Sequence, residues 1–160
     1  MMDSVYMAFL VLAGLPLLAF VISVLWVMMA RRNRDLARDE WAAERTDPRA
    51  ENARMIIVLA YGGTKVIYGV VQAFYLAMQS GCFSGMPEAL ELGLSLPAFC
   101  ALFGAVNALT TLAGGGVAAG AVRREALTDM EGFRRTIIKL CLVEFAAVCG
   151  LLASFLLILF

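Results

Sequence analysis

The fold is decided by the stretch TIIKLCLVEFAAVCGLLASFLLILF, residues 136–160, whose two charged residues are Lys139 near its start and Glu144 near its middle. About 20 consecutive apolar residues span the hydrocarbon core of a bilayer as a helix. A charged side chain near the bilayer centre costs several kcal/mol, so an ionisable residue there is a candidate functional site. Glu144 is therefore the first candidate in this chain.

The composition is typical of a membrane protein. Hydrophobic residues make up 62% of the 160 residues and charged residues only 16%, whereas about a quarter of the residues of an average soluble domain are charged. Because little is left for a soluble domain, the sequence predicts an all-α, multi-pass membrane protein. Its four apolar stretches, each long enough to span a bilayer, are residues 6–30, 55–79, 95–122 and 136–160.

Basic residues are spread unequally over the connections. They crowd residues 31–54 and 123–139, whereas residues 80–91 contain no lysine or arginine. By the positive-inside rule, connections 31–54 and 123–135 are cytoplasmic. The sequence thus predicts two helical hairpins in the cell membrane, residues 1–79 and 80–160, with both termini outside the cytoplasm. The seven arginines of the first connection are Arg31, Arg32, Arg34, Arg38, Arg45, Arg49 and Arg54.

Capping patterns predict where two helices begin. Asp47 followed by Pro48 indicates an N-cap and a first-turn proline. Thr128-Asp-Met-Glu131 fits a capping box with Thr128 as the N-cap. We therefore expect the second and fourth helices to begin about two turns before the lipid.

The sequence lacks the motifs of soluble enzymes. It has no histidine, no metal-ligand spacing among its acidic residues, and no P-loop, GxGxxG or nucleophile-elbow motif. Three cysteines (Cys100, Cys141 and Cys149) fall in predicted spans and only Cys82 lies outside them, which gives no disulfide framework. We expect no enzymatic activity from the chain by itself, no cofactor and no nucleic-acid partner.

An internal repeat relates the two hairpins. The segment GVVQAF, residues 69–74, matches GLLASF, residues 150–155, at an offset of 81 residues. On this register Glu144 falls opposite Gly63, so only the second copy holds a carboxylate. The pattern predicts a duplicated hairpin.

The third span is rich in glycine. Small residues let membrane helices approach closely, because packing drives helix association in lipid. We expect a tightly packed interface here, within one subunit or between subunits. Its glycines are Gly114, Gly115, Gly116 and Gly120.

A depth count predicts the surroundings of Glu144. Lys65 lies ten residues beyond Met55, and Glu144 lies nine beyond Arg135. At about 1.5 Å per residue, both lie roughly 13–15 Å into a hydrocarbon core about 30 Å thick. Because the second and fourth helices run in the same direction, we expect the polar side chains Thr64, Lys65 and Tyr68 at Glu144, and those of Asn107, Thr110 or Thr111 slightly further out.

A carboxylate in this setting is suited to carrying a monovalent cation. Desolvation favours its neutral form and nearby donors favour its ionised form, so a small rearrangement switches it between loaded and empty. Lys65 opens two other interpretations: it pairs permanently with Glu144, or its long side chain reaches toward the cytoplasmic surface.

Four segments also carry a resemblance to a known family. They are YGGTKVIYG (residues 61–69), GLSLP (93–97), the glycine-rich 114–120, and LVE (142–144) followed by Gly150 and Ser154-Phe155. In this order and spacing they resemble the proteolipid subunit, K or c, of V-type and A-type rotary ATPases. The resemblance covers residues 54–160.

The resemblance implies a function and its partners. Members of that family assemble into a membrane ring of duplicated hairpins that turns in the lipid against a stator subunit, whose arginine discharges each carboxylate. It implies that Glu144 carries the ion, that Thr64 and Tyr68 support it, and that Tyr61 contributes its backbone. The cytoplasmic loops would contact central-stalk subunits.

Departures from the family pattern indicate which ion is carried. Sodium-binding members have glutamine where this chain has Lys65, and a second expected glutamine falls at Ala113. The loss of two neutral oxygen ligands and the gain of a positive charge favour H⁺ over Na⁺. The first span also departs, since it is bulky, with only Gly14, and contains Pro16 and Trp26.

Two alternatives stay open from the sequence. A small proton-coupled exporter also needs a membrane carboxylate, but requires a substrate cavity lined by aromatic residues near Glu144. A non-transporting membrane scaffold would hold Lys65 and Glu144 as a permanent ion pair.

Overall fold

The computed structural model describes residues 2–37, 47–79 and 95–159. Within these ranges it contains helices and no strands: α1 (Met2–Ala37), α3 (Pro48–Gln79), α4 (Leu96–Arg123) and α5 (Met130–Leu159). All four helices are long and apolar enough to cross a membrane, which confirms the predicted all-α fold class with four spans. Arg38, Arg45 and Cys82 lie outside the described residues.

The helices extend beyond the predicted spans toward the two basic connections. α1 continues to Ala37, α3 begins at Pro48 and α5 begins at Met130. The carboxylate of Asp47 accepts hydrogen bonds from the backbone N–H groups of Arg49 (2.9 Å) and Ala50 (3.4 Å). The predicted N-cap of α3 is therefore confirmed.

The predicted N-cap of α5 is wrong by one residue. Asp129, not Thr128, caps the helix, since its Oδ1 accepts a hydrogen bond of 2.6 Å from the N–H of Gly132. The hydroxyl of Thr128 instead donates to the carbonyl oxygen of Glu125 (2.7 Å). Glu125 has a positive φ of 56°, and the turn built around it engages the threonine before the helix begins.

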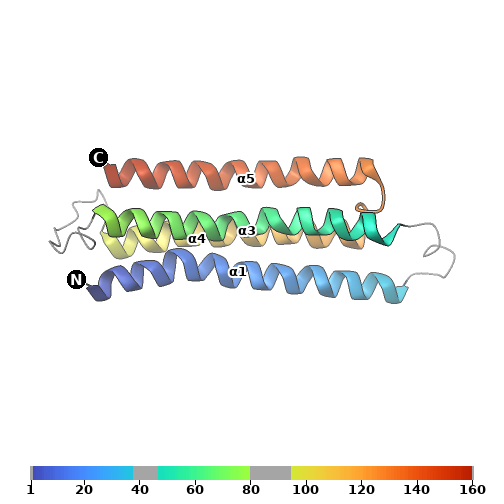
Figure 1. Cartoon of the computed structure of the whole chain (residues 1–160), viewed down its shortest axis with the longest axis horizontal. Helices are drawn as coiled ribbons and strands as arrows, with labels where there is room; N and C mark the ends of the chain where they lie inside the picture. Colours follow the sequence, from blue (N-terminus) through green and yellow to red (C-terminus); the bar gives the residue numbers. More distant parts are fainter. Residues whose placement is uncertain (1, 38–46, 80–94, 160) are drawn as a thin grey trace.

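The helices run up and down, and both termini lie at the same end of the bundle (Figure 1). α3 and α4 lie in the middle, with α1 and α5 on opposite sides (Figure 1). α1 packs along both α3 and α4, and α5 packs on the same two helices; among the described residues α1 and α5 have no contact. α5 is thus a peripheral helix of the bundle.

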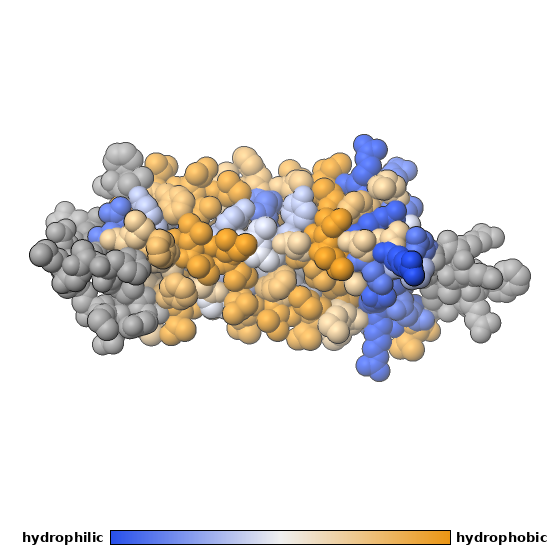
Figure 2. All heavy atoms as spheres, in the orientation of Figure 1, coloured by the Kyte–Doolittle hydropathy of each residue, from blue (hydrophilic) through white to orange (hydrophobic). Residues whose placement is uncertain are grey.

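The outer surface is a broad apolar band (Figure 2). Large apolar side chains point outward from every helix, including Leu10 (64% exposed), Ile56 (66%), Leu109 (65%) and Phe145 (69%). Hydrophilic residues gather at the end that carries the two basic connections, and a small polar patch interrupts the band near its middle, between α3 and α5 (Figure 2). This distribution is that of a multi-pass membrane protein, in which lipid covers the apolar side chains.

Two apolar clusters form the interior, one nearer each end. The cluster nearer the basic connections includes Val27, Val58 and Leu140, and the cluster nearer the termini includes Leu12, Leu76 and Phe99. A layer of buried polar side chains lies between the clusters, contributed by Ser23, Lys65, Gln72, Asn107, Thr111 and Ser154. The candidate site lies in this layer.

The repeat glycines make equivalent contacts in the two hairpins. A Cβ added to Gly69 of α3 would overlap the carbonyl oxygen of Leu12 in α1, and one added to Gly150 of α5 would lie 2.9 Å from Val106 Cγ1 in α4. Each glycine therefore packs against the first helix of its own hairpin. Pro16 lies four residues after Leu12 and has no N–H to donate to that carbonyl, so the carbonyl is free to approach α3.

The glycines of α4 differ in what they contact. A Cβ on Gly115 would overlap the side chain of Ser23 in α1, so α1 and α4 approach closely there. A Cβ on Gly114 would meet Leu140 at an ordinary 3.8 Å, and one on Gly116 would meet nothing within 4 Å. Gly120 faces Arg124, in the turn that follows α4. Gly115 is therefore the close-packing glycine within the subunit, and Gly116 faces open space.

Candidate functional site

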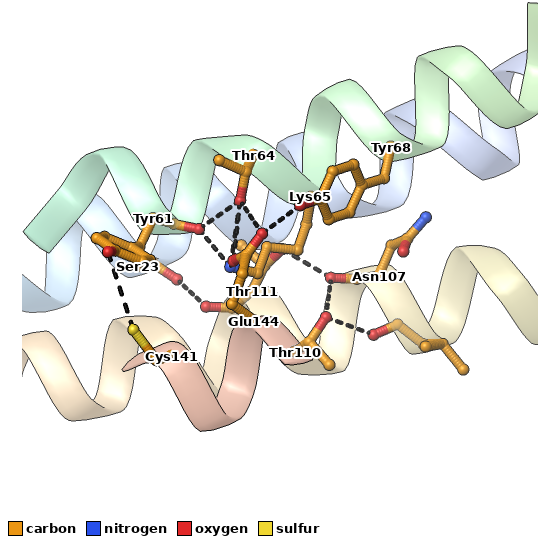
Figure 3. A network of polar contacts seen from close by, with 11 residues as sticks. Ser23, Tyr61, Thr64, Lys65, Tyr68, Asn107, Thr110, Thr111, Cys141 and Glu144 are labelled. Carbon is orange, nitrogen blue, oxygen red and sulfur yellow. Dashed lines mark hydrogen bonds and ion pairs between the residues drawn. The ribbon is translucent and has the colours of Figure 1, made fainter. Parts of the chain in front are cut away.

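Glu144 lies where α5 crosses the polar layer, and α3 supplies its partners (Figure 3). The hydroxyl of Thr64 lies 3.0 Å from Oε1 and 3.1 Å from Oε2 of Glu144. Tyr68 donates its phenolic hydrogen to Oε1, and the ammonium of Lys65 forms an ion pair with Oε2. Every side chain that the depth count placed beside Glu144 on α3 is in contact with it.

The periodicity of α3 brings these partners together. Thr64 and Tyr68 are four residues apart and therefore lie on one face of the helix, with Lys65 beside them. The hydroxyl of Thr64 has a single hydrogen and also lies 2.8 Å from the carbonyl oxygen of Tyr61. It can donate to that carbonyl or to the carboxylate, but not to both at once.

Lys65 is more deeply buried than Glu144. Its side chain is 1% exposed, whereas that of Glu144 is 18% exposed. The ammonium contacts the carbonyl oxygen of Tyr61 and Glu144 Oε2, and it lies 3.3 Å from the hydroxyl of Thr64. Lys65 therefore points into the protein, and its side chain does not extend to the membrane surface.

Tyr61 takes part through its backbone alone. Its carbonyl oxygen accepts from Thr64 and Lys65. Its phenolic oxygen lies 4.0 Å from the Sγ of Cys141 on α5, one turn before Glu144. The backbone contribution expected of Tyr61 is thus directed at the lysine ammonium.

The polar residues of α4 do not reach Glu144. Thr110 and Thr111 donate to carbonyl oxygens of their own helix, Thr110 to Val106 (2.8 Å) and Thr111 to Asn107 (2.7 Å). The side-chain amide of Asn107 donates to Gln72 Oε1 (2.8 Å). The expected contribution of a polar group from α4 to the carboxylate is therefore absent from the described part of the chain.

A second chain of polar side chains, which was not predicted from the sequence, lies in the same layer. Gln72 of α3 donates to Ser154 of α5 (2.9 Å) and accepts from Asn107 of α4, which joins three helices. Within the described residues, Asn107 Oδ1 has no hydrogen-bond partner. Gln72 follows Lys65 by seven residues, two turns along the same face of α3, and that spacing is the signal that could have revealed it.

The geometry resembles a cation-binding site in which the ammonium group of Lys65 takes the place of a bound cation. The carbonyl oxygen of Tyr61, the hydroxyl of Thr64 and the carboxylate of Glu144 surround one ammonium. Hard metal cations also bind to oxygen ligands of these kinds. Among the described residues, no group of three or more His, Cys, Asp or Glu side chains could hold a metal ion. The site pairs one positive charge with one negative charge inside an apolar bundle.

Comparison with known proteins finds no family model that matches this chain and no curated protein that matches it.

Proposed function

We propose that this chain is a rotor-ring subunit of a V-type or A-type ATPase or ATP synthase and that it moves protons across the membrane through the Glu144 site. The observation that carries the proposal is the position of Glu144. Its carboxylate lies near the middle of a peripheral apolar helix and contacts three residues of α3, and its side chain is still 18% exposed.

The exposure of the Glu144 side chain is what a rotor subunit requires. A group that exchanges its ion with a stator must be reachable from outside its own bundle, and α5 has the smallest buried share of the four spans, 17%. The ring arrangement, the stator arginine and contacts of the basic loops with a central stalk follow from the sequence resemblance. In this arrangement both termini lie outside the cytoplasm, as the positive-inside rule predicts.

The contacts of Lys65 favour H⁺ as the transported ion. A sodium ion at Glu144 would compete for the same oxygens with an ammonium that is already there. Like charges this close repel strongly inside an apolar bundle. A proton needs no coordination shell and can be exchanged within the existing hydrogen bonds.

The test is Glu144→Gln in the assembled complex. Proton uptake into membrane vesicles, driven by ATP, should be lost while the subunit still assembles with its partners. Glu131→Gln is the matched control, because Glu131 lies on the same helix and its ion pair with Arg135 is largely exposed. Uptake should be unchanged in that control, and normal uptake by the Glu144→Gln variant would contradict the proposal.

The ion pair itself favours a second candidate, a non-transporting membrane scaffold. Lys65 is almost fully buried against Glu144, and such a pair can serve to hold α3 and α5 in register. Exchanging the two residues, Lys65→Glu with Glu144→Lys, separates the candidates. A structural pair would keep its function after the exchange, whereas a proton carrier should lose transport.

A further inference from the structure

The site has an inner and an outer end. Lys65 lies at the inner end, with its ammonium among oxygens of Tyr61, Thr64 and Glu144. Glu144 lies at the outer end, where its side chain is 18% exposed. Figure 3 shows the ammonium of Lys65 next to the carboxylate of Glu144. A proton that reaches the ammonium from the more exposed side of the pair meets the Glu144 side chain first.

The charge of the pair depends on the number of exchangeable protons that it holds. With one proton, an ammonium faces a carboxylate and the two charges cancel. Without it, a neutral amine faces a carboxylate and the pair carries one negative charge. These are the net charges of a protonated and an ionised carboxyl group. A lysine–glutamate pair can therefore load and unload like a single carboxyl group.

We propose that Lys65 holds the exchangeable proton in the loaded state of this site, and that Glu144, ionised in both the loaded and the empty state, relays the proton between Lys65 and the outside. This inference rests on the proposed proton-transport function and names the group that bears the proton. On unloading, the proton passes from Nζ of Lys65 to Oε2 of Glu144 and on to a water or base at the open side, which leaves a neutral amine. Loading reverses these steps.

Hydroxyl groups from α3 contact the carboxylate of Glu144. Tyr68 donates to Oε1, and the Thr64 hydroxyl can donate to the carboxylate or to the carbonyl oxygen of Tyr61. A hydrogen bond donated to a carboxylate stabilises its charged form. The other titratable groups nearby are Tyr61, whose hydroxyl faces the thiol of Cys141, and Lys139, which is exposed on α5. Among the described residues, α1 and α4 contribute no charged group to the polar layer.

Two substitutions at Lys65 test the proposal in different ways. Arginine keeps the positive charge but does not release its proton in proteins, so proton uptake in Lys65→Arg should fall to background. Methionine has a similar length and no charge, so in Lys65→Met the carboxyl group of Glu144 should take up the proton itself. Uptake by Lys65→Arg equal to that of the unchanged protein would overturn the proposal.

A chemical test needs no transport and uses the purified chain in detergent. A hydrophobic carbodiimide reacts with a protonated carboxyl group: the carboxyl oxygen bonds to the carbodiimide carbon, and the proton moves to its nitrogen. We expect no adduct at Glu144 in the unchanged protein and an adduct at Glu144 in Lys65→Met, both read by mass spectrometry of peptides. Labelling of Glu144 in the unchanged protein to the same extent as in Lys65→Met would overturn the proposal.

The chain offers a matched control, because Lys65 and Lys139 are its two lysines. Lys139→Met removes the other lysine, five residues before Glu144, and should leave Glu144 unlabelled.

Failure of the inference and failure of the proposed function are distinguishable. Labelling of the unchanged protein together with normal proton uptake would place the proton on Glu144 and keep the transport function. Absence of uptake in the unchanged complex would refute the transport function, and the labelling pattern would still show which group holds the proton.

Discussion

At the residue scale, the feature that needs explanation is a lysine that is 1% exposed inside a membrane span. Removing one partner of a buried ion pair leaves the other charge without compensation, whereas removing both is often neutral. The pair therefore couples the stability of α3 to that of α5.

A double-mutant cycle tests this coupling. Glu144→Gln should lower the free energy of unfolding in detergent by about 3–5 kcal/mol, because it leaves the ammonium unpaired. The double variant Lys65→Met with Glu144→Gln should recover most of that loss. Thermal denaturation of the single and double variants measures the coupling, and additive effects of the two substitutions would show that the residues do not interact.

Much of the site is predictable from the sequence because helix geometry is regular. Counting residues from the apolar boundary placed Lys65 and Glu144 at one level, and parallel helices then brought Thr64 and Tyr68 to the same carboxylate. The pairing of Gln72 with Asn107 was not predictable in this way. It depends on how each helix is rotated about its axis, and a helix that is apolar on all sides carries little information about rotation.

At the element scale, close approach of backbones holds the first hairpin together. Gly69 packs on the backbone of Leu12, where Pro16 supplies no helical hydrogen bond. The contact between Gly69 and Leu12 was not predicted. The repeat identified Gly69 as a matched position but did not indicate which residue it packs against. The bulky first span packs without a run of glycines because the glycines lie on the helices opposite it, at Gly69 and Gly115.

Gly69→Ala should therefore destabilise the chain, and Gly116→Ala should not. A Cβ at Gly69 would lie 2.8 Å from the carbonyl carbon of Leu12, a backbone atom that cannot move aside alone. Overpacking of this kind costs about 1–3 kcal/mol. At Gly116 the added methyl group meets open space, and alanine favours a helix by up to about 1 kcal/mol. Thermal unfolding of the two variants in detergent measures the difference in stability. Equal stabilities of Gly69→Ala and Gly116→Ala would contradict the close contact between Gly69 and Leu12.

Polar contacts join the helices at the end of the bundle that carries the two basic connections. The guanidinium of Arg54 on α3 donates to the carbonyl oxygens of Leu127 (2.9 Å) and Thr128 (2.8 Å) in the connection between α4 and α5. Arg34 of α1 forms a buried ion pair with Glu51 of α3. The positive-inside rule explains the arginines of the basic connections only as a bias in charge. The structure shows that two of them, Arg34 and Arg54, also connect helices.

At the scale of the whole molecule, the order of the helices is that of two parallel hairpins with one peripheral helix, α5, that carries the carboxylate. The number of spans was predictable from apolar length, whereas the helices extend beyond the predicted limits at the basic connections. The peripheral position of α5 was not, because it depends on which apolar faces pack together.

The predicted orientation can be tested directly. A short protease-sensitive tag placed after Phe160 should be cleaved in intact cells by a protease added outside, since both termini are expected on that side. A second tag within residues 38–46 should be cleaved only in opened or inverted membranes. The reverse pattern would show that the basic connections lie outside.

The most direct test of the central claim is electron microscopy of the assembly extracted in mild detergent. A rotor subunit should give a closed ring of copies of this chain, with α5 on the outer surface where a stator subunit can reach Glu144. Single chains or an oligomer that does not close into a ring would contradict the assignment to a rotor.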